Sequence, residues 1–171
     1  TVSVLYWTVS VHVMSQQPRT VVVGCDHGAV EMKNEIAALL TAQGHTVLDV
    51  GTNSKDSVDY PDFAAAGCAK VQQGEASLGF LFCGSGIGIS IAANKCAGIR
   101  AALCHDHYTA KMSREHNDAN IMCAGARTTG IEVVKDMVLT FLATPFAGGR
   151  HEGRVGKIMA LQSAAPAAKQ E

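Results

Sequence analysis

The sequence lacks a strong net charge, a long apolar run and any pattern of paired cysteines. Its 14 basic and 15 acidic residues give a formal net charge of −1, which argues against general binding to nucleic acid or anionic membranes. No stretch approaches the roughly 20 apolar residues of a membrane-spanning helix. The 6 cysteines show neither a CxxC pair nor zinc-ligand spacing, so we expect reduced thiols and a cytoplasmic protein.

The length of 171 residues and the 47% content of hydrophobic residues predict one domain with a sizeable core. The first 18 residues are apolar and β-branched, without the basic start of a secretory signal or the arginines of a transit peptide. Met14 precedes the polar segment 15–19, and we expect the natural start there. The predicted organisation is an N-terminal extension over 1–18, disordered or packed adventitiously, and a domain over 19–171.

Short β-branched or apolar runs alternate with segments of helical periodicity. Strands are expected over 20–24, 45–50, 78–82, 98–104 and 119–124. Helices are expected over 30–43, 61–73, 89–95, 106–114, 128–142 and 150–163. This alternation predicts a three-layer αβα sandwich around a five-stranded parallel, Rossmann-like sheet.

The last predicted helix, 150–163, has no strand to follow, and a frayed tail is expected over 164–171. A helix appended in this way often covers a neighbouring subunit. We therefore expect it to pack on a second copy of the chain in a homo-oligomer.

Residues 78–95, LGFLFCGSGIGISIAANK, combine a buried strand, a glycine loop and a helix. This order aims backbone N–H groups and a helix dipole at one point, which suits an anion. The loop differs from the dinucleotide fingerprint because Ile89 occupies the last glycine position, and no Gly-Lys-Ser/Thr follows as in a P-loop. Cys83 stands at its rim, where a helix N-terminus favours the thiolate. Our hypothesis is that Cys83 is a base whose product anion the loop holds; a tight strand–helix connection is the alternative.

Polar residues follow several strands at the edge where parallel sheets bind ligands. Asp26 and His27 follow the first strand, and His116 lies in the polar segment 114–120, which we expect to be a turn at the same edge. Turn geometry alone explains many such histidines, but this placement favours a functional role. The run 104–107 contains two histidines, yet adjacent residues of an extended segment point opposite ways, so no metal site is predicted.

Three arginines indicate a phosphorylated small molecule. Arg127 follows the fifth strand directly, and Arg150 and Arg154 share one face of the last helix, with His151 beside them. Guanidinium groups bind phosphate through two parallel hydrogen bonds. A solvated basic helix face is the alternative interpretation.

Four segments closely resemble the ribose-5-phosphate isomerase type B family, which also includes bacterial galactose-6-phosphate isomerase subunits. They are CDHGA at 25–29, CGSGIGISIAANK at 83–95, GIRAALC at 98–104 and SREHNDANIMCAGAR at 113–127. The resemblance covers roughly residues 20–161. It implies the interconversion of ribose 5-phosphate and ribulose 5-phosphate in the non-oxidative pentose phosphate pathway, without metal or organic cofactor.

The resemblance also implies roles for individual residues. Cys83 moves the proton between C1 and C2, and the Ile at position 89, where one family branch has a glutamate base, leaves that role to Cys83. By the same resemblance, His116 with Asp26 opens the furanose ring, Ser85 assists proton transfer between O1 and O2, and Asn117 contacts sugar hydroxyls. The enediolate oxygen is held by the N–H groups of Gly84, Ser85, Gly86, Ile87 and Gly88. The phosphate is bound by His27, Arg127, Arg150 and Arg154, with His151 nearby. Two subunits complete each site, in a homodimer or a dimer of dimers.

Three other functions stay open at this point. The same chemistry on a hexose 6-phosphate, such as allose or galactose 6-phosphate, needs only a roomier pocket. A non-catalytic sugar-phosphate-binding module would not need both Cys83 and His116. A thiol redox enzyme built on Cys83 would need a nearby partner cysteine, for which Cys25 is the candidate.

Overall fold

Strands and helices alternate along the chain in the computed structural model, which describes residues 17–163. Within that range the strands are β1 (Thr20–Cys25), β2 (Thr46–Asp49), β3 (Leu78–Cys83), β4 (Ala101–Leu103) and β5 (Ile121–Gly125). The helices are α1 (Val30–Ala42), α2 (Tyr60–Gln72), α3 (Ile87–Ala93), α4 (His107–Asn117), α5 (Ile131–Ala143) and α6 (Arg150–Ser163). Most of the extension predicted over 1–18, and the whole tail predicted over 164–171, lie outside the described residues.

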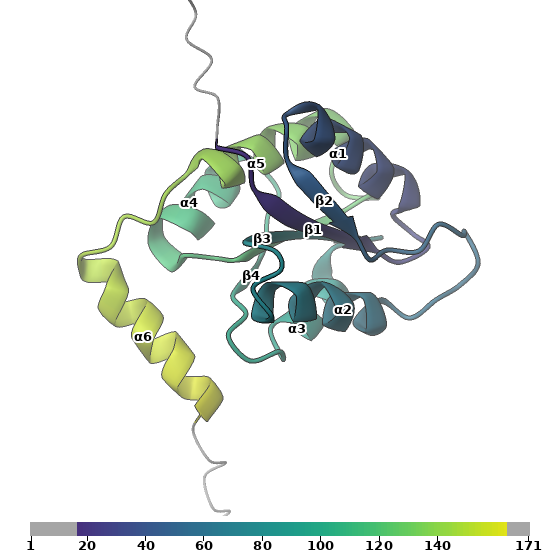
Figure 1. Ribbon diagram of the computed structural model, residues 1–171. Helices are drawn as coiled ribbons and strands as arrows, with labels where there is room; N and C mark the ends of the chain where they lie inside the picture. The colour runs from purple at the N-terminus through teal and green to yellow at the C-terminus, as the bar shows by residue number, and fades with distance from the viewer. Residues whose placement is uncertain (1–16, 164–171) are drawn as a thin grey trace, which may run out of the picture.

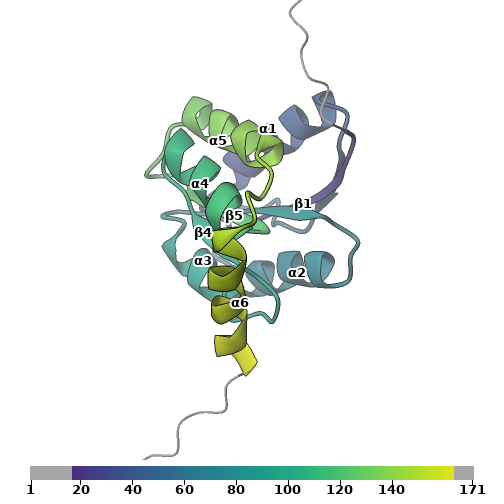
Figure 2. The same ribbon diagram turned by 90° about the vertical axis from the view of Figure 1, so that its left-hand side faces the viewer.

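The strands form one parallel sheet in the order β2-β1-β3-β5-β4. Helices α1, α4 and α5 cover one face, and α2 and α3 cover the other (Figures 1 and 2). The predicted three-layer αβα sandwich with a five-stranded parallel sheet is therefore confirmed. Because all strands run the same way, the residues that follow β1, β3, β4 and β5 meet at one edge of the sheet.

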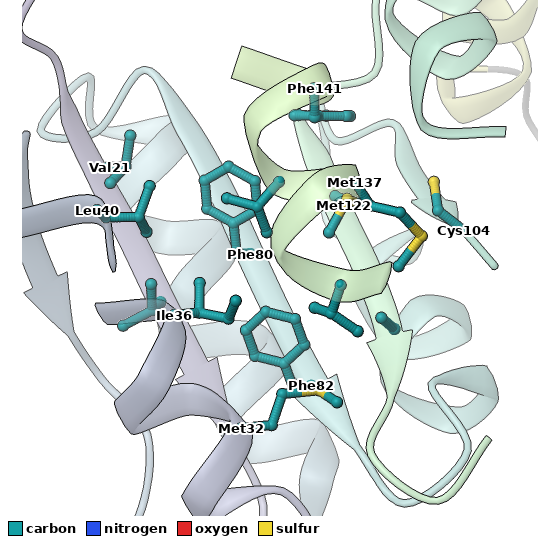
Figure 3. Close-up of a cluster of buried hydrophobic side chains, with 14 of the residues drawn as sticks. Val21, Met32, Ile36, Leu40, Phe80, Phe82, Cys104, Met122, Met137 and Phe141 are labelled. Atoms are coloured by element: carbon teal, nitrogen blue, oxygen red, sulfur yellow. The ribbon is translucent and has the colours of Figure 1, made fainter. Parts of the chain in front are cut away.

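The central strand β3 is buried on both faces. Phe80 and Phe82 face the layer of α1 and α5, where the rings of Phe80 and Phe141 meet edge to face at 5.8 Å (Figure 3). Leu81 and Cys83 face the layer of α2 and α3. Each large side chain buried in this way stabilises the fold by about 1.5–3 kcal/mol. Strand β3 therefore holds the residues that follow it in a fixed position.

Several element boundaries differ from the predicted ones. Helix α3 starts at Ile87 rather than at residue 89, because Gly86 adopts φ +78° and turns the chain directly into the helix. Strand β4 is limited to 101–103, since the side chains of Asn94 and Asn120 take the backbone N–H groups of Ala101 and Arg100. Helix α4 runs to Asn117, three residues beyond the predicted end, and Asp118 ends it with φ +45°.

Helix α6 extends from the rest of the chain on the side where β1 begins (Figure 1). It is tied to its own chain near its far end, where the Gln162 side chain accepts from the Gly98 N–H at 2.9 Å and donates to the Cys96 carbonyl at 3.2 Å. Its Ile158 and Leu161 side chains are exposed. No helix within residues 17–163 combines the length and apolar character needed to cross a membrane.

Candidate active site

Cys83 is the last residue of β3, and a three-residue turn joins it to α3. The turn requires glycine at 86: besides the positive φ, a Cβ there would lie 2.6 Å from Leu103 Cδ1 and 2.8 Å from the Ala124 carbonyl carbon. The turn is thus pressed against the ends of β4 and β5. This close approach fixes the backbone N–H groups around the cysteine.

The Cys83 sulfur accepts a hydrogen bond from the Gly86 N–H at 3.1 Å. The residue is only 4% exposed and packs against the α2–α3 layer. A backbone N–H aimed at sulfur stabilises negative charge that develops on it. All six cysteines are free, as the cysteine spacing predicted.

Two of the five N–H groups expected to hold the anion already donate hydrogen bonds within the turn. The Gly86 N–H is on the Cys83 sulfur, and the Ile87 N–H donates to Ser85 Oγ at 3.3 Å. The N–H groups of Gly84, Ser85 and Gly88 have no acceptor among residues 17–163. The donors available to a ligand are therefore fewer than the five that the sequence suggested.

Asp26 and His27 follow β1, next to the Cys83 turn. Asp26 is buried, and its carboxylate accepts from the Gly28 N–H at 2.8 Å. The Val58 N–H donates to His27 Nδ1 at 3.2 Å. Because Nδ1 is an acceptor, the neutral ring carries its proton on Nε2, which leaves one N–H donor for a ligand.

Arg127 reaches the same place from β5. Its backbone N–H donates to the Gly84 carbonyl at 2.9 Å, and a Cβ at Gly84 would lie 3.4 Å from the Arg127 guanidinium carbon. A Cβ at Gly28 would lie 3.3 Å from the Gly84 nitrogen. The loops after β1, β3 and β5 therefore meet at Gly84.

A cleft of about 520 Å³ opens beside this junction, between the N-terminal ends of α1 and α5. His27 and Arg127 line it together, and Lys55 reaches it from the loop between β2 and α2. Cys83 does not line the cleft; it lies behind Gly84, which is in contact with Arg127. The structure thus brings together the predicted residues Asp26, His27, Cys83, Gly84, Ser85, Gly86, Ile87, Gly88 and Arg127.

The other predicted site residues form a second cluster, where α4 ends and α6 begins. The rings of His116 and His151 are stacked, with centroids 4.2 Å apart and planes at 8°. Arg150 Nε donates a long hydrogen bond of 3.5 Å to His151 Nε2. Arg154 is one turn further along α6, and Asn117 closes α4, its carbonyl accepting from Arg100 Nε at 3.1 Å.

The predicted placement of His116 at the ligand-binding edge is wrong. Helix α4 starts after the carboxyl end of β4 and returns across the sheet, so its last turn, with His116 and Asn117, lies at the amino ends of the strands. The cause is the topology, because the residues between α4 and β5 precede a parallel strand and so lie at its amino end wherever the helix stops. Within one chain, Cys83 and His116 are at opposite ends of the sheet.

Sequence reasoning missed the backbone contact that orients His27, and it missed the ion pair of Lys55 with Glu31 at 2.7 Å beside the cleft. Val58 and Lys55 belong to the segment between β2 and α2, which the sequence marks only as a polar connection. A fully buried lysine, Lys33, holds that segment through Asp49 at 2.7 Å and Asn53 at 2.8 Å. No periodicity or motif signals a contact of this kind.

Comparison with known proteins identifies the family. The chain matches the Ribose/Galactose Isomerase family over residues 21–158. It is 46% identical over 139 residues to ribose-5-phosphate isomerase B of Escherichia coli (strain K12), covering 81% of this chain and 93% of the relative.

Solved structures agree. Type B ribose 5-phosphate isomerase of Leishmania infantum is 51% identical, with a TM-score of 0.82 over 86% of this chain and 98% of that one. Ribose-5-phosphate isomerase B of Clostridium thermocellum is 49% identical, with a TM-score of 0.83 over 84% of this chain and 97% of that one. With this fold, and with the four sequence segments placed as described, the chain belongs to the ribose/galactose isomerase family.

Proposed function

We propose that the chain is an aldose–ketose isomerase that interconverts D-ribose 5-phosphate and D-ribulose 5-phosphate through an enediolate. The observation that carries the proposal is the Cys83 thiol, hydrogen-bonded by the Gly86 N–H at 3.1 Å behind a cleft with His27 and Arg127, in a member of this family. In the non-oxidative pentose phosphate pathway that the resemblance implies, this reaction interconverts an aldose phosphate and the corresponding ketose phosphate.

Cys83 acts as the base in this mechanism. Its thiolate takes the proton from C2 of the open-chain aldose, the electron pair forms the enediolate, and the same proton returns to C1 to give the ketose. Ser85 carries the proton between O1 and O2. A positioned base typically contributes 10²–10⁴-fold, and each oxyanion donor about 10²–10³-fold.

The N–H groups of Gly84, Ser85 and Gly88 are the donors left for the enediolate oxygen. Gly86 and Ile87 act within the turn instead: Gly86 stabilises the thiolate, and Ile87 holds Ser85 in place. This division refines the role that the resemblance gives to the whole loop.

Phosphate binding falls first to His27 and Arg127, which line the same cleft. His27 offers its Nε2 proton, and Arg127 offers a charged fork of donors. Binding the phosphate away from the reacting carbons orients the sugar, which is where much of the rate gain of such an enzyme arises.

A second copy of the chain completes the site in this proposal. His116 and Asn117, with Arg150 and Arg154, lie at the amino end of their own sheet, so they meet Cys83 only across an interface between two copies. His116 of one copy, with Asp26 of the other, opens the furanose ring, and the two arginines add to the phosphate site. The protein is accordingly a homodimer or a dimer of dimers, with α6 packed on the neighbour.

The chemistry requires no metal or organic cofactor, since the base and the oxyanion donors come from the chain itself. Six free cysteines accord with a reducing compartment, and we propose the cytoplasm.

The test is turnover by the purified full chain. Ribose 5-phosphate should be converted to ribulose 5-phosphate, with a kcat/KM at least about tenfold above that for allose or galactose 6-phosphate. Faster turnover of a hexose phosphate would give the hexose assignment instead. Binding of sugar phosphate by calorimetry without turnover of any of them would leave a non-catalytic binding module.

A further inference from the structure

The stacked pair of His116 and His151 joins two helices that otherwise have few contacts. His116 is in the last turn of α4, and His151 is the second residue of α6. The segment between α5 and α6 contacts α4 close to this pair, where the Ala147 N–H donates to the Glu115 carbonyl at 3.0 Å. His151 is 8% exposed, and its ring packs against the His116 ring.

The surroundings of His151 keep it neutral. The charged and titratable groups that face it are His116 and Glu115 on α4 and Arg150 and Arg154 on its own helix. Burial lowers the pKa of His151, and His116 and the two arginines lower it further, while Glu115 acts the other way. A neutral imidazole has one donor and one acceptor nitrogen, and here the acceptor Nε2 faces Arg150.

This state is unfavourable for a phosphate ligand. One face of the ring is covered by His116, one nitrogen is already directed to Arg150, and the ring carries no positive charge near neutral pH. What the ring does provide is a flat, rigid surface against the His116 imidazole. Parallel aromatic rings at this separation stabilise each other's orientation.

We propose that His151 is a positioning residue that holds the His116 imidazole in the orientation needed for ring opening, and that it does not bind phosphate. The proposal rests on the proposed function, in which His116 acts on the furanose ring. Stacking restrains rotation of the His116 ring about its side chain, and the ring is held with Nε2 3.9 Å from Glu115 Oε1. A catalytic group misplaced by about 1 Å loses on the order of 10²-fold in rate.

The experiment compares two variants of similar size at position 151, assayed with ribose 5-phosphate. His151→Leu fills the space without an aromatic ring and should lower kcat about 10- to 100-fold, with KM changed less than about threefold. His151→Phe restores a flat ring without a titratable nitrogen and should recover kcat to within about fivefold of the parent. Should His151→Leu fail to fold, as judged by circular dichroism, His151→Gln replaces it.

Two further variants separate the explanations. Gln162→Ala removes the hydrogen bonds at the other end of α6 and leaves the ring pair intact, so kcat should change less than about twofold. His116→Ala reports on the proposed function itself, and full activity in that variant would overturn the role of His116. If His116→Ala is slow, the positioning role of His151 is overturned by any of three results: His151→Phe as slow as His151→Leu, an unchanged kcat in His151→Leu, or a KM raised tenfold with kcat unchanged.

Discussion

Adding one methyl group at Gly86 should damage both the fold and the proposed site. Gly86 has φ +78°, and a non-glycine residue with left-handed backbone costs roughly 1–2 kcal/mol. A Cβ there would also lie 2.8 Å from the Ala124 carbonyl carbon and 2.9 Å from the Gly125 nitrogen, which are backbone atoms that yield only if β5 shifts. Overpacking of this kind costs a further 1–3 kcal/mol or so, so Gly86→Ala should lower the free energy of unfolding by about 2–5 kcal/mol.

The matched control is Gly44→Ala. Gly44 has φ +86° but nothing within 4 Å of an added Cβ, so it carries the backbone cost alone, about 1–2 kcal/mol. Urea unfolding of both variants isolates the steric part as their difference. Because the Gly86 N–H would leave the Cys83 sulfur, kcat should also fall about 100-fold in Gly86→Ala only. Equal losses of stability in the two variants would refute the close packing of the turn.

Three further predictions concern Lys33, His45 and helix α6. Lys33→Met should lower the free energy of unfolding in urea by about 1.5–3 kcal/mol, because it removes two charged hydrogen bonds to Asp49 and Asn53 while keeping the buried methylenes. A loss below about 0.5 kcal/mol would contradict the role of these two hydrogen bonds. Burial lowers the pKa of His45, as Arg19 does further, so its contribution is present above the unfolded value of about 6.5 and is lost as the pH falls below it. The free energy of unfolding in urea should fall from pH 7 to pH 5, and it should fall less steeply in His45→Gln than in the parent. An identical dependence on pH in the two proteins would refute this. Leu161→Asp, at a side chain 76% exposed in the single chain, should shift the sedimenting species toward monomer if α6 packs on a neighbour, and an unchanged mass would contradict that packing.

The fold followed closely from the sequence because its signals are local. A β-branched or apolar run such as Thr20–Cys25 or Leu78–Cys83 is a strand buried by helices on both faces, and the boundaries of α6 matched the prediction. The error in strand β4 falls where side chains replace backbone hydrogen bonds. Asn94 and Asn120 shorten β4 in this way, and neither effect is visible in hydrophobic periodicity.

The candidate site was predictable in part, for a related reason. Residues that directly follow strands, such as His27 and Arg127, are placed by topology, and they share the cleft as expected. His116 was misplaced because it precedes β5 instead of following a strand, and residues that precede a parallel strand lie at the amino end of the sheet. The contacts of Lys33 and Val58 at the other end depend on tertiary structure rather than on spacing along the chain.

The most direct test of the central claim follows hydrogen exchange into the sugar. Ribulose 5-phosphate incubated in deuterium oxide with the parent protein should acquire deuterium at the carbon that the base deprotonates, as measured by nuclear magnetic resonance. Cys83→Ala should still bind the sugar phosphate, because the cleft with His27 and Arg127 is intact, but should incorporate deuterium at least about 100-fold more slowly. Deuterium incorporation at the parent rate in Cys83→Ala would contradict the claim that this thiol is the base.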